Sequence, residues 1–148
     1  MKKGFTFLEM LIGVAIIGVV ATIFASSLSL FKESSQLDES QVALVGLVRD
    51  ARGRTIASEN NASYGVHFEQ TQAVLFQGVS YNSLSVSNEP YILPSFVQIS
   101  AISLAGGSDV LFQRLSGTTT NSGTVTLQSK NNVSRTRIIT IYTIGNVK

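Results

Sequence analysis

The first part of the chain carries two successive hydrophobic patterns. An uncharged run from Met10 to Phe31 is apolar on every side, whereas from Lys32 to about Ser58 apolar residues recur at helical spacing on one face only. As a helix, the first run would be about 33 Å long at roughly 1.5 Å per residue, which matches the hydrocarbon core of a bilayer. The two patterns predict one long helix that spans a membrane and then continues outside it as an amphipathic segment.

The predicted amphipathic segment carries apolar and charged side chains on opposite faces. The apolar face consists of Leu37, Leu44, Val48 and Ala51, with Leu47 beside them, and the charged face consists of Asp38, Glu39, Arg49 and Asp50. We expect the apolar face to bury against a sheet, and the charged face to meet water or neighbouring subunits.

The densest charge cluster of the chain lies at the end of this segment. It consists of Arg49, Asp50, Arg52 and Arg54. We interpret it as a solvated helix end, where cations are favourable near the C-terminal dipole, and a contact with another subunit is the alternative. Gly53 weakens helical order, so we expect the helix to end between Arg52 and Glu59.

Beyond Asn60 and Asn61, short runs rich in aromatic and β-branched residues predict strands. The predicted strands are 64–69, 72–77, 91–99, 110–114, 124–128 and 135–143. A hairpin is expected at 70–71, and Pro94 makes 91–99 a bent or edge strand. The segments 78–89 and 116–123 are rich in Ser, Asn, Thr and Gly and are expected to be loops.

These elements predict an α+β fold, in which a long N-terminal helix packs on a C-terminal antiparallel β-domain. We divide the chain into a leader at 1–4, a membrane-spanning helix at 5–31, an amphipathic continuation at 32–58, and a β-domain at 59–148. Lys2 and Lys3 precede the apolar run, and Lys32 after it is offset by Glu33. The excess of positive charge keeps the leader in the cytoplasm and places the β-domain outside the inner membrane.

An acidic residue, Glu9, interrupts the start of the apolar region. A carboxylate in hydrocarbon is unfavourable and usually marks a function. A secretory signal peptide also begins with cations, but its apolar core is only about 7–15 residues long. A local alternative is a capping box from Thr6 to Glu9, and capping and a function in assembly are compatible.

The N-terminal residues Lys2-Lys3-Gly4-Phe5-Thr6-Phe7-Leu8-Glu9 resemble the class III leader and N-terminal helix of type IV pilins and type II secretion pseudopilins. The resemblance implies that a prepilin peptidase cleaves between Gly4 and Phe5 and methylates the new N-terminus of Phe5. It also implies that Glu9 pairs with the N-terminal amine of a neighbouring subunit and sets the axial register of the helices. The implied partners are the peptidase, other subunits and an inner-membrane assembly platform.

The distal part of the chain is similar to the H-type pseudopilins and related minor pilins, including the T-type subunits tied to DNA uptake. The similar stretches are Tyr64-Gly65-Val66, the segment from Phe112 to Gly117, residues 123–127, and the last predicted strand with Gly145 after it. DNA-binding T-type relatives carry a Gly-Arg-x-Arg motif where this chain has Gly145-Asn146-Val147-Lys148. Both arginines are replaced, so bidentate phosphate contacts at that site are lost or weakened.

Charge and composition add one hint and remove several function classes. The chain has 11 Lys and Arg residues against 9 Asp and Glu, and no acid follows Asp109. The cations of that C-terminal stretch are the candidate DNA-binding residues Arg114, Lys130, Arg135, Arg137 and Lys148. The chain has no Cys and a single histidine, His67, so we expect no metal site, no cofactor and no enzyme activity.

The sequence therefore predicts a minor pilin or pseudopilin, a structural subunit assembled through its N-terminal helix. The alternative is a filament-tip subunit that binds DNA for uptake. Type IV pilus and type II secretion pseudopilus both stay open, as do the major and minor roles, although the H-type resemblance favours a minor one. Related helices often carry a proline near the position of Ser26, and none is present here, so local melting of the helix on assembly also stays open.

Overall fold

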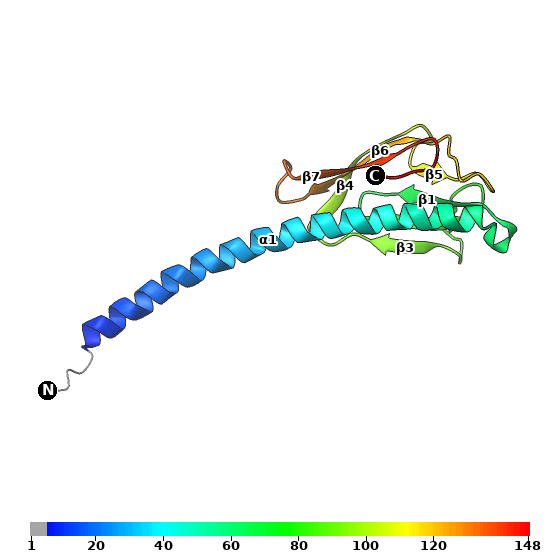
Figure 1. Ribbon diagram of the computed structural model, residues 1–148. Coiled ribbons are helices and arrows are strands. Elements are labelled where there is room, and N and C mark those ends of the chain that lie inside the picture. Colours follow the sequence, from blue (N-terminus) through cyan, green and yellow to red (C-terminus); the bar gives the residue numbers. More distant parts are fainter. Residues whose placement is uncertain (1–5) are drawn as a thin grey trace. The chain divides into compact units, whose positions relative to one another are not determined.

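The computed structural model describes residues 6–148 and, within them, all side chains except those of residues 25–30. One helix, α1 (Phe7–Ile56), is followed by a short 3-10 turn, η1 (Glu59–Asn61), and by strands (Figure 1). The strands are β1 (Tyr64–Phe68), β2 (Gln72–Gln77), β3 (Glu89–Ile92), β4 (Val97–Leu104), β5 (Asp109–Leu111), β6 (Gly123–Ser129) and β7 (Thr136–Ile141). The α+β class with antiparallel strands is confirmed, and α1 ends inside the expected range.

The strands form two antiparallel sheets with the orders β3-β2-β1-β5 and β4-β6-β7. The predicted hairpin between β1 and β2 is confirmed, with Val66 opposite Leu75. The prediction of a single strand at 91–99 is wrong, because β3 and β4 belong to different sheets, but each of them is an edge strand, as Pro94 led us to expect. Pro94 lies between them and its carbonyl accepts a hydrogen bond from Val97 N–H, which turns the chain from one sheet to the other.

The chain divides into two compact units, unit 1 (Met1–Ser34) and unit 2 (Ser35–Lys148). In unit 1, the helical window Phe7–Phe24 has a mean hydropathy of 2.5, and none of it is buried within the protein. Large apolar side chains there, such as Phe7 and Ile17, are more than half exposed. By length and composition, this stretch is able to cross a membrane.

In unit 2, one face of α1 is fully buried. Leu44, Val48 and Ala51 each have an exposed fraction of 0%. Two small polar residues share this face and bond back to helix carbonyls: Ser40 Oγ donates to Gln36 O at 2.7 Å, and Thr55 Oγ1 donates to Ala51 O at 2.8 Å. The face is therefore buried without unsatisfied hydroxyl groups.

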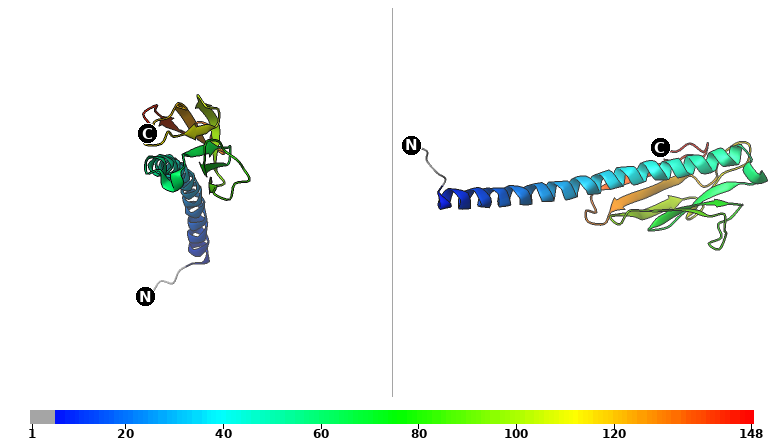
Figure 2. Two further views of the ribbon diagram at one scale, coloured as in Figure 1. Left: turned by 90° about the vertical axis from the view of Figure 1, so that its right-hand side faces the viewer. Right: turned by 90° about the horizontal axis from the view of Figure 1, so that it is seen from below.

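Both sheets complete the core that begins on α1. Seen along the helix, the strands of unit 2 lie on one side of it (Figure 2). Large, fully buried strand and loop residues of this core include Phe68, Leu75, Phe112, Leu127 and Ile139. Tyr64 and Phe68 are buried within it.

A second, smaller apolar layer covers the outer face of the β1–β2 hairpin. Phe76 is 1% exposed and lies over Gly65, where an added Cβ would come within 2.6 Å of the Phe76 ring. Tyr81, from the loop after β2, packs on Phe76 with ring centroids 5.8 Å apart. The loop therefore acts as a cover for this sheet face.

Two loops close on the end of α1 through glycines with positive φ. Gly117 and Gly145 have φ of 64° and 78°, and a Cβ on Gly145 would overlap the carbonyl oxygen of Gly117. Arg52 Nε donates a hydrogen bond to that same oxygen at 3.0 Å. Val147, just beyond, forms an isolated bridge with Ile141 and is 2% exposed.

We expect Gly145→Ala to destabilise unit 2 more than Gly107→Ala. Both glycines have φ of 78°, so both substitutions carry a left-handed penalty of roughly 1–2 kcal/mol. Only Gly145 has backbone in the way, which adds about 1–3 kcal/mol of overpacking, whereas nothing lies within 4 Å of a Cβ on Gly107. Denaturant unfolding of the full-length chain in detergent measures the difference, and equal free energies of unfolding would contradict the close approach.

Candidate functional site

The N-terminal site begins at the first turn of α1. Glu9 N–H donates to Thr6 Oγ1 at 3.3 Å and to Thr6 O at 3.1 Å, so Thr6 is the N-cap of the helix. This is the Thr6 half of the predicted capping box. Gly4 and Phe5, the predicted cleavage and methylation residues, lie outside the described residues.

Glu9 lies at one end of a shallow apolar groove on the helix surface. The groove is lined by Glu9, Met10, Gly13, Val14 and Ile17. Gly13 opens it, because nothing lies within 4 Å of the place where its Cβ would be. An exposed carboxylate beside such a groove is suited to receive a cation carried by another apolar helix, since a carboxylate in hydrocarbon is stable only when paired.

The charge cluster at the end of α1 contacts its own domain, which differs from the expected solvated helix end. Arg49 Nη2 donates to Val147 O at 3.3 Å, and Arg52 Nη2 donates to Ile144 O at 3.5 Å, in addition to the bond from Arg52 to Gly117. The arginines thus satisfy carbonyls of the loops that close on the helix. Helical spacing identified the cluster but did not reveal these partners, which come from residues 65 to 98 positions away.

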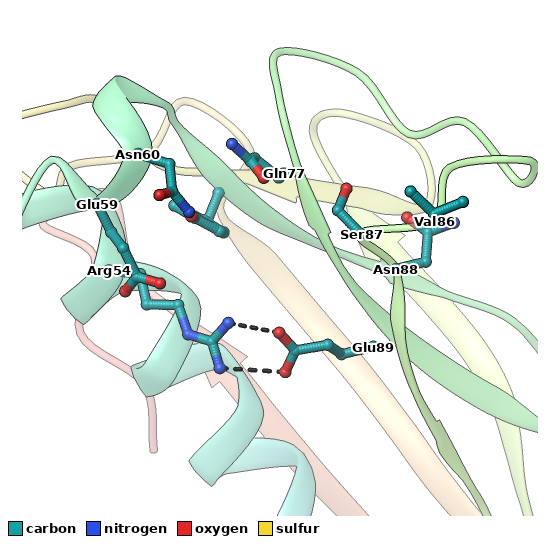
Figure 3. A pocket seen from close by; sticks show the side chains of 9 residues that line it. Arg54, Glu59, Asn60, Gln77, Val86, Ser87, Asn88 and Glu89 are labelled. Carbon is teal, nitrogen blue, oxygen red and sulfur yellow. Dashed lines mark hydrogen bonds and ion pairs between the residues drawn. The ribbon is translucent and has the colours of Figure 1, made fainter.

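Arg54 forms a fork-like ion pair with Glu89 at the mouth of a polar pocket (Figure 3). The two bonds measure 2.5 and 3.1 Å, and Asp50 lies 2.8 Å from the same guanidinium. The hydrogen bonds that Arg54 donates to Glu89, and then to Asp50, raise the pKa of Arg54 above its ordinary value. The pocket holds about 240 Å³ and is lined by Arg54, Glu59, Asn60, Tyr64, Gln77, Val86, Ser87, Asn88 and Glu89. Arg54 and Glu89 are paired with each other across it, so the pair serves to fasten the start of β3 to the helix.

The five candidate DNA-binding cations do not form one cluster. Arg114 Nη2 bonds Asn61 Oδ1 at 2.5 Å, just beyond the end of α1, whereas Arg137 Nε bonds Asp38 Oδ1 at 2.7 Å. Asp38 and the helix end are about 27 Å apart along α1 at roughly 1.5 Å per residue. Lys130 and Arg135 border the β6–β7 turn, and the backbone of Lys148 pairs with that of Thr140.

His67 lies on the outer face of β1 between two carboxylates. Its Nδ1 is 2.5 Å from Asp109 Oδ1, its Nε2 is 3.5 Å from Glu69 Oε1, and its ring stacks on Tyr81 at 4.0 Å between centroids. The two acids engage opposite ring nitrogens and so do not converge on one point. Within residues 6–148, no group of three or more His, Asp or Glu side chains is arranged to hold a metal ion.

Comparison with known proteins identifies the N-terminal stretch. Residues 1–25 match the family model of the prokaryotic N-terminal methylation motif. No curated protein and no solved structure matches the chain.

The prepilin motif and the apolar helix that follows it together indicate membrane anchoring. Residues 1–25 carry the class III prepilin leader motif of type IV pilins and pseudopilins, and the helix and antiparallel sheets that follow have a pilin-like arrangement. The motif implies processing by a prepilin peptidase and assembly with other pilin subunits, and it is typical of structural subunits.

We expect unit 2 to lose less stability at alkaline pH in Tyr81→Phe than in the wild type. Burial, followed by the charges of Glu69 and Asp109, raises the pKa of Tyr81 above 10.0. The folded protein therefore holds the phenolic proton more tightly than the unfolded chain. This contribution is complete below the unfolded pKa of about 10 and is lost as the pH rises through the folded pKa.

Melting temperatures of the full-length chain between neutral pH and about pH 11 measure this effect across the tyrosine pKa. Tyr81→Leu is the comparison, because it removes the stacked ring and lowers the melting temperature at every pH. If the melting temperature of Tyr81→Phe falls at alkaline pH as steeply as that of the wild type, the phenol of Tyr81 does not cause the fall.

Proposed function

We propose that the protein is a minor pilin or pseudopilin, a structural subunit of a type IV pilus or a type II secretion pseudopilus. The observation that carries the proposal is the position of Glu9, in the first turn of a helix whose apolar side chains are exposed, directly after a prepilin leader. Segment 1–4 is removed, 5–31 forms the filament core, 32–58 continues the helix, and 59–148 forms the β-domain.

Cleavage between Gly4 and Phe5 would leave a new N-terminal amine on Phe5. In the bilayer or the filament core, Glu9 of an entering subunit pairs with that amine on the subunit already in place. Removing one partner of a buried ion pair costs roughly 3–5 kcal/mol, because the other charge stays buried without compensation. The groove beside Glu9 gives the neighbouring helix a place to approach, since Gly13 adds no side chain there.

The minor role is supported by the resemblance of the distal chain to H-type pseudopilins. The order β3-β2-β1-β5 and the closure of the C-terminal stretch on Arg49 and Arg52 make a compact domain. Before assembly, the precursor would span the inner membrane with its leader in the cytoplasm and its β-domain outside, in contact with the assembly platform.

DNA uptake at a filament tip has less support. Arg137 is occupied by Asp38, Arg114 lies at the other end of the domain, and the Gly145 motif lacks both arginines. Phosphate contacts by single, separated cations give weak and strongly salt-dependent binding. A structural role therefore explains more of the observed contacts.

We expect the mature protein to begin with N-methylated Phe5. Mass spectrometry of protein purified from cells with and without an active prepilin peptidase tests this directly. The peptidase-free cells should contain only the chain that still carries residues 1–4. A mature N-terminus at any other position would exclude the proposed processing.

We expect Glu9→Ala to lower incorporation into filaments at least about tenfold, since a missing ion-pair partner leaves the amine unpaired. Glu9→Gln should fail similarly, because it keeps the shape and removes the charge. Glu39→Ala is the control, since Glu39 is an exposed acid on α1 within unit 2. Quantitative immunoblotting of sheared filaments against cell-bound protein gives the ratio, and a wild-type ratio for Glu9→Ala would falsify the register role.

A further inference from the structure

The turn between β6 and β7 combines exposed apolar and basic side chains. Val133 at its apex is 67% exposed, and Lys130 is exposed at its start. Arg135 is half-buried at its end, with its carbonyl accepting a hydrogen bond from Ser129 N–H. Phe96 is 37% exposed, and its carbonyl accepts a bond from Lys130 N–H at 2.9 Å. We call Phe96, Lys130, Val133 and Arg135 the tip patch.

The tip patch lies at the end of unit 2 where the chain enters it. Strand β7 runs along α1 in the same direction as the helix: Arg137 bonds Asp38, whereas Ile141 bridges to Val147, whose carbonyl accepts a bond from Arg49. Residues before Arg137 therefore lie beyond Asp38, toward the first residue of the unit. Figure 2 shows the β6–β7 hairpin, in orange, along the cyan part of α1.

Chain length alone keeps this end of unit 2 near the membrane. The apolar run ends at Phe31, seven residues before Asp38. Seven residues cover about 10 Å as a helix and at most roughly 25 Å when fully extended. The headgroup layer on each side of the hydrocarbon core is itself about 5–8 Å thick. The first residues of unit 2, beside which the tip patch lies, are therefore at most roughly 25 Å along the chain from the end of the apolar run.

We propose that the tip patch binds anionic lipid headgroups on the outer surface of the membrane that anchors the precursor. Lys130 and Arg135 contact headgroup phosphates, while Val133 and Phe96 enter the interfacial layer. A cationic face next to exposed apolar and aromatic side chains is the chemistry that binds an anionic bilayer surface. Asp38 does not repel the anionic lipid, because Arg137 pairs with its carboxylate. Glu39, the next residue on α1, is an exposed acid.

Lipid fits this patch better than DNA does. A membrane plane meets one end of the domain, where the apolar residues accompany the cations, whereas a DNA duplex has no layer to receive Val133 and Phe96. Arg114, the cation at the other end, has no part in the contact. The proposal rests on membrane anchoring and requires neither cleavage of the leader nor a filament.

The test uses full-length, uncleaved protein reconstituted into vesicles of phosphatidylcholine, with or without phosphatidylglycerol. The chain has no cysteine, so Ser134→Cys places a single nitroxide label in the turn. Ser116→Cys is the matched control in the loop that closes on Arg52. We expect phosphatidylglycerol to shield the Ser134 label from a water-soluble nickel chelate, and to leave the Ser116 label unchanged.

Removing the patch cations should reverse the shielding. Each cation near an anionic surface contributes roughly fivefold in binding, so Lys130→Gln with Arg135→Gln should return the label to its phosphatidylcholine value. If the double variant unfolds, Lys130→Gln alone serves as the test, because Lys130 is exposed. Its loss should leave a partial shielding of the label that is sensitive to salt. Arg114→Gln should change nothing.

Two outcomes would overturn the proposal. One is shielding of the Ser134 label that is equal in both lipid compositions, or that is not reduced at all by Lys130→Gln. The other is shielding by duplex DNA in phosphatidylcholine vesicles without any effect of phosphatidylglycerol, which would assign the patch to nucleic acid. Glu9→Ala should leave the lipid effect intact, so failure of filament assembly and failure of lipid binding are separate results.

Discussion

The packing of one helix face sets the arrangement of unit 2. Leu44, Val48 and Ala51 present no accessible surface, and both sheets supply side chains to the core that they begin. Burying a large aliphatic side chain stabilises a fold by about 1.5–3 kcal/mol, so this face and its partners dominate the stability of the domain. Ser40 and Thr55 have small side chains whose hydroxyl groups bond to carbonyls of the helix, which lets the sheets approach the helix closely.

The same helix has a different task in unit 1, where its apolar side chains have no partner within the protein. The continuous apolar surface of Phe7–Phe24 needs lipid or other helices around it. Glu9 gives the helix a different free energy in each of these two environments. In lipid the carboxylate has no fixed counter-charge, whereas beside another subunit it gains the amine that we propose as its partner. In the proposed filament, the difference between these two states favours assembly in addition to apolar burial.

Much of this fold was predictable because its signals are local. Helical periodicity identified Leu37, Leu44, Val48 and Ala51 as the buried face of the helix. The strand after Pro94 was misjudged, because a run of β-branched residues does not show that the chain changes sheets between Leu93 and Val97. The second half of β4, up to Leu104, and the pairing of Val147 with Ile141 were missed for the same reason: their partners are distant in sequence.

The candidate site divides in the same way. The leader and Glu9 were visible because they form a contiguous motif, which the match over residues 1–25 confirms. The partners of Arg52, Arg54 and Arg137 were not visible, because a charge pattern on a helix does not specify which loop returns to it. Composition suggested that the cations after Asp109 act together. Only the topology shows that Arg114 and the β6–β7 turn lie at different places in the domain.

The contacts of Arg52 also bear on where this domain is able to fold. Exported domains of this size are often cross-linked by disulfides, which require an oxidising compartment and the enzymes that maintain it. Here a guanidinium holds the Gly117 and Ile144 carbonyls in place, and the chain contains no cysteine. The closure of its loops is consequently independent of redox state, so the same fold is available on either side of the membrane.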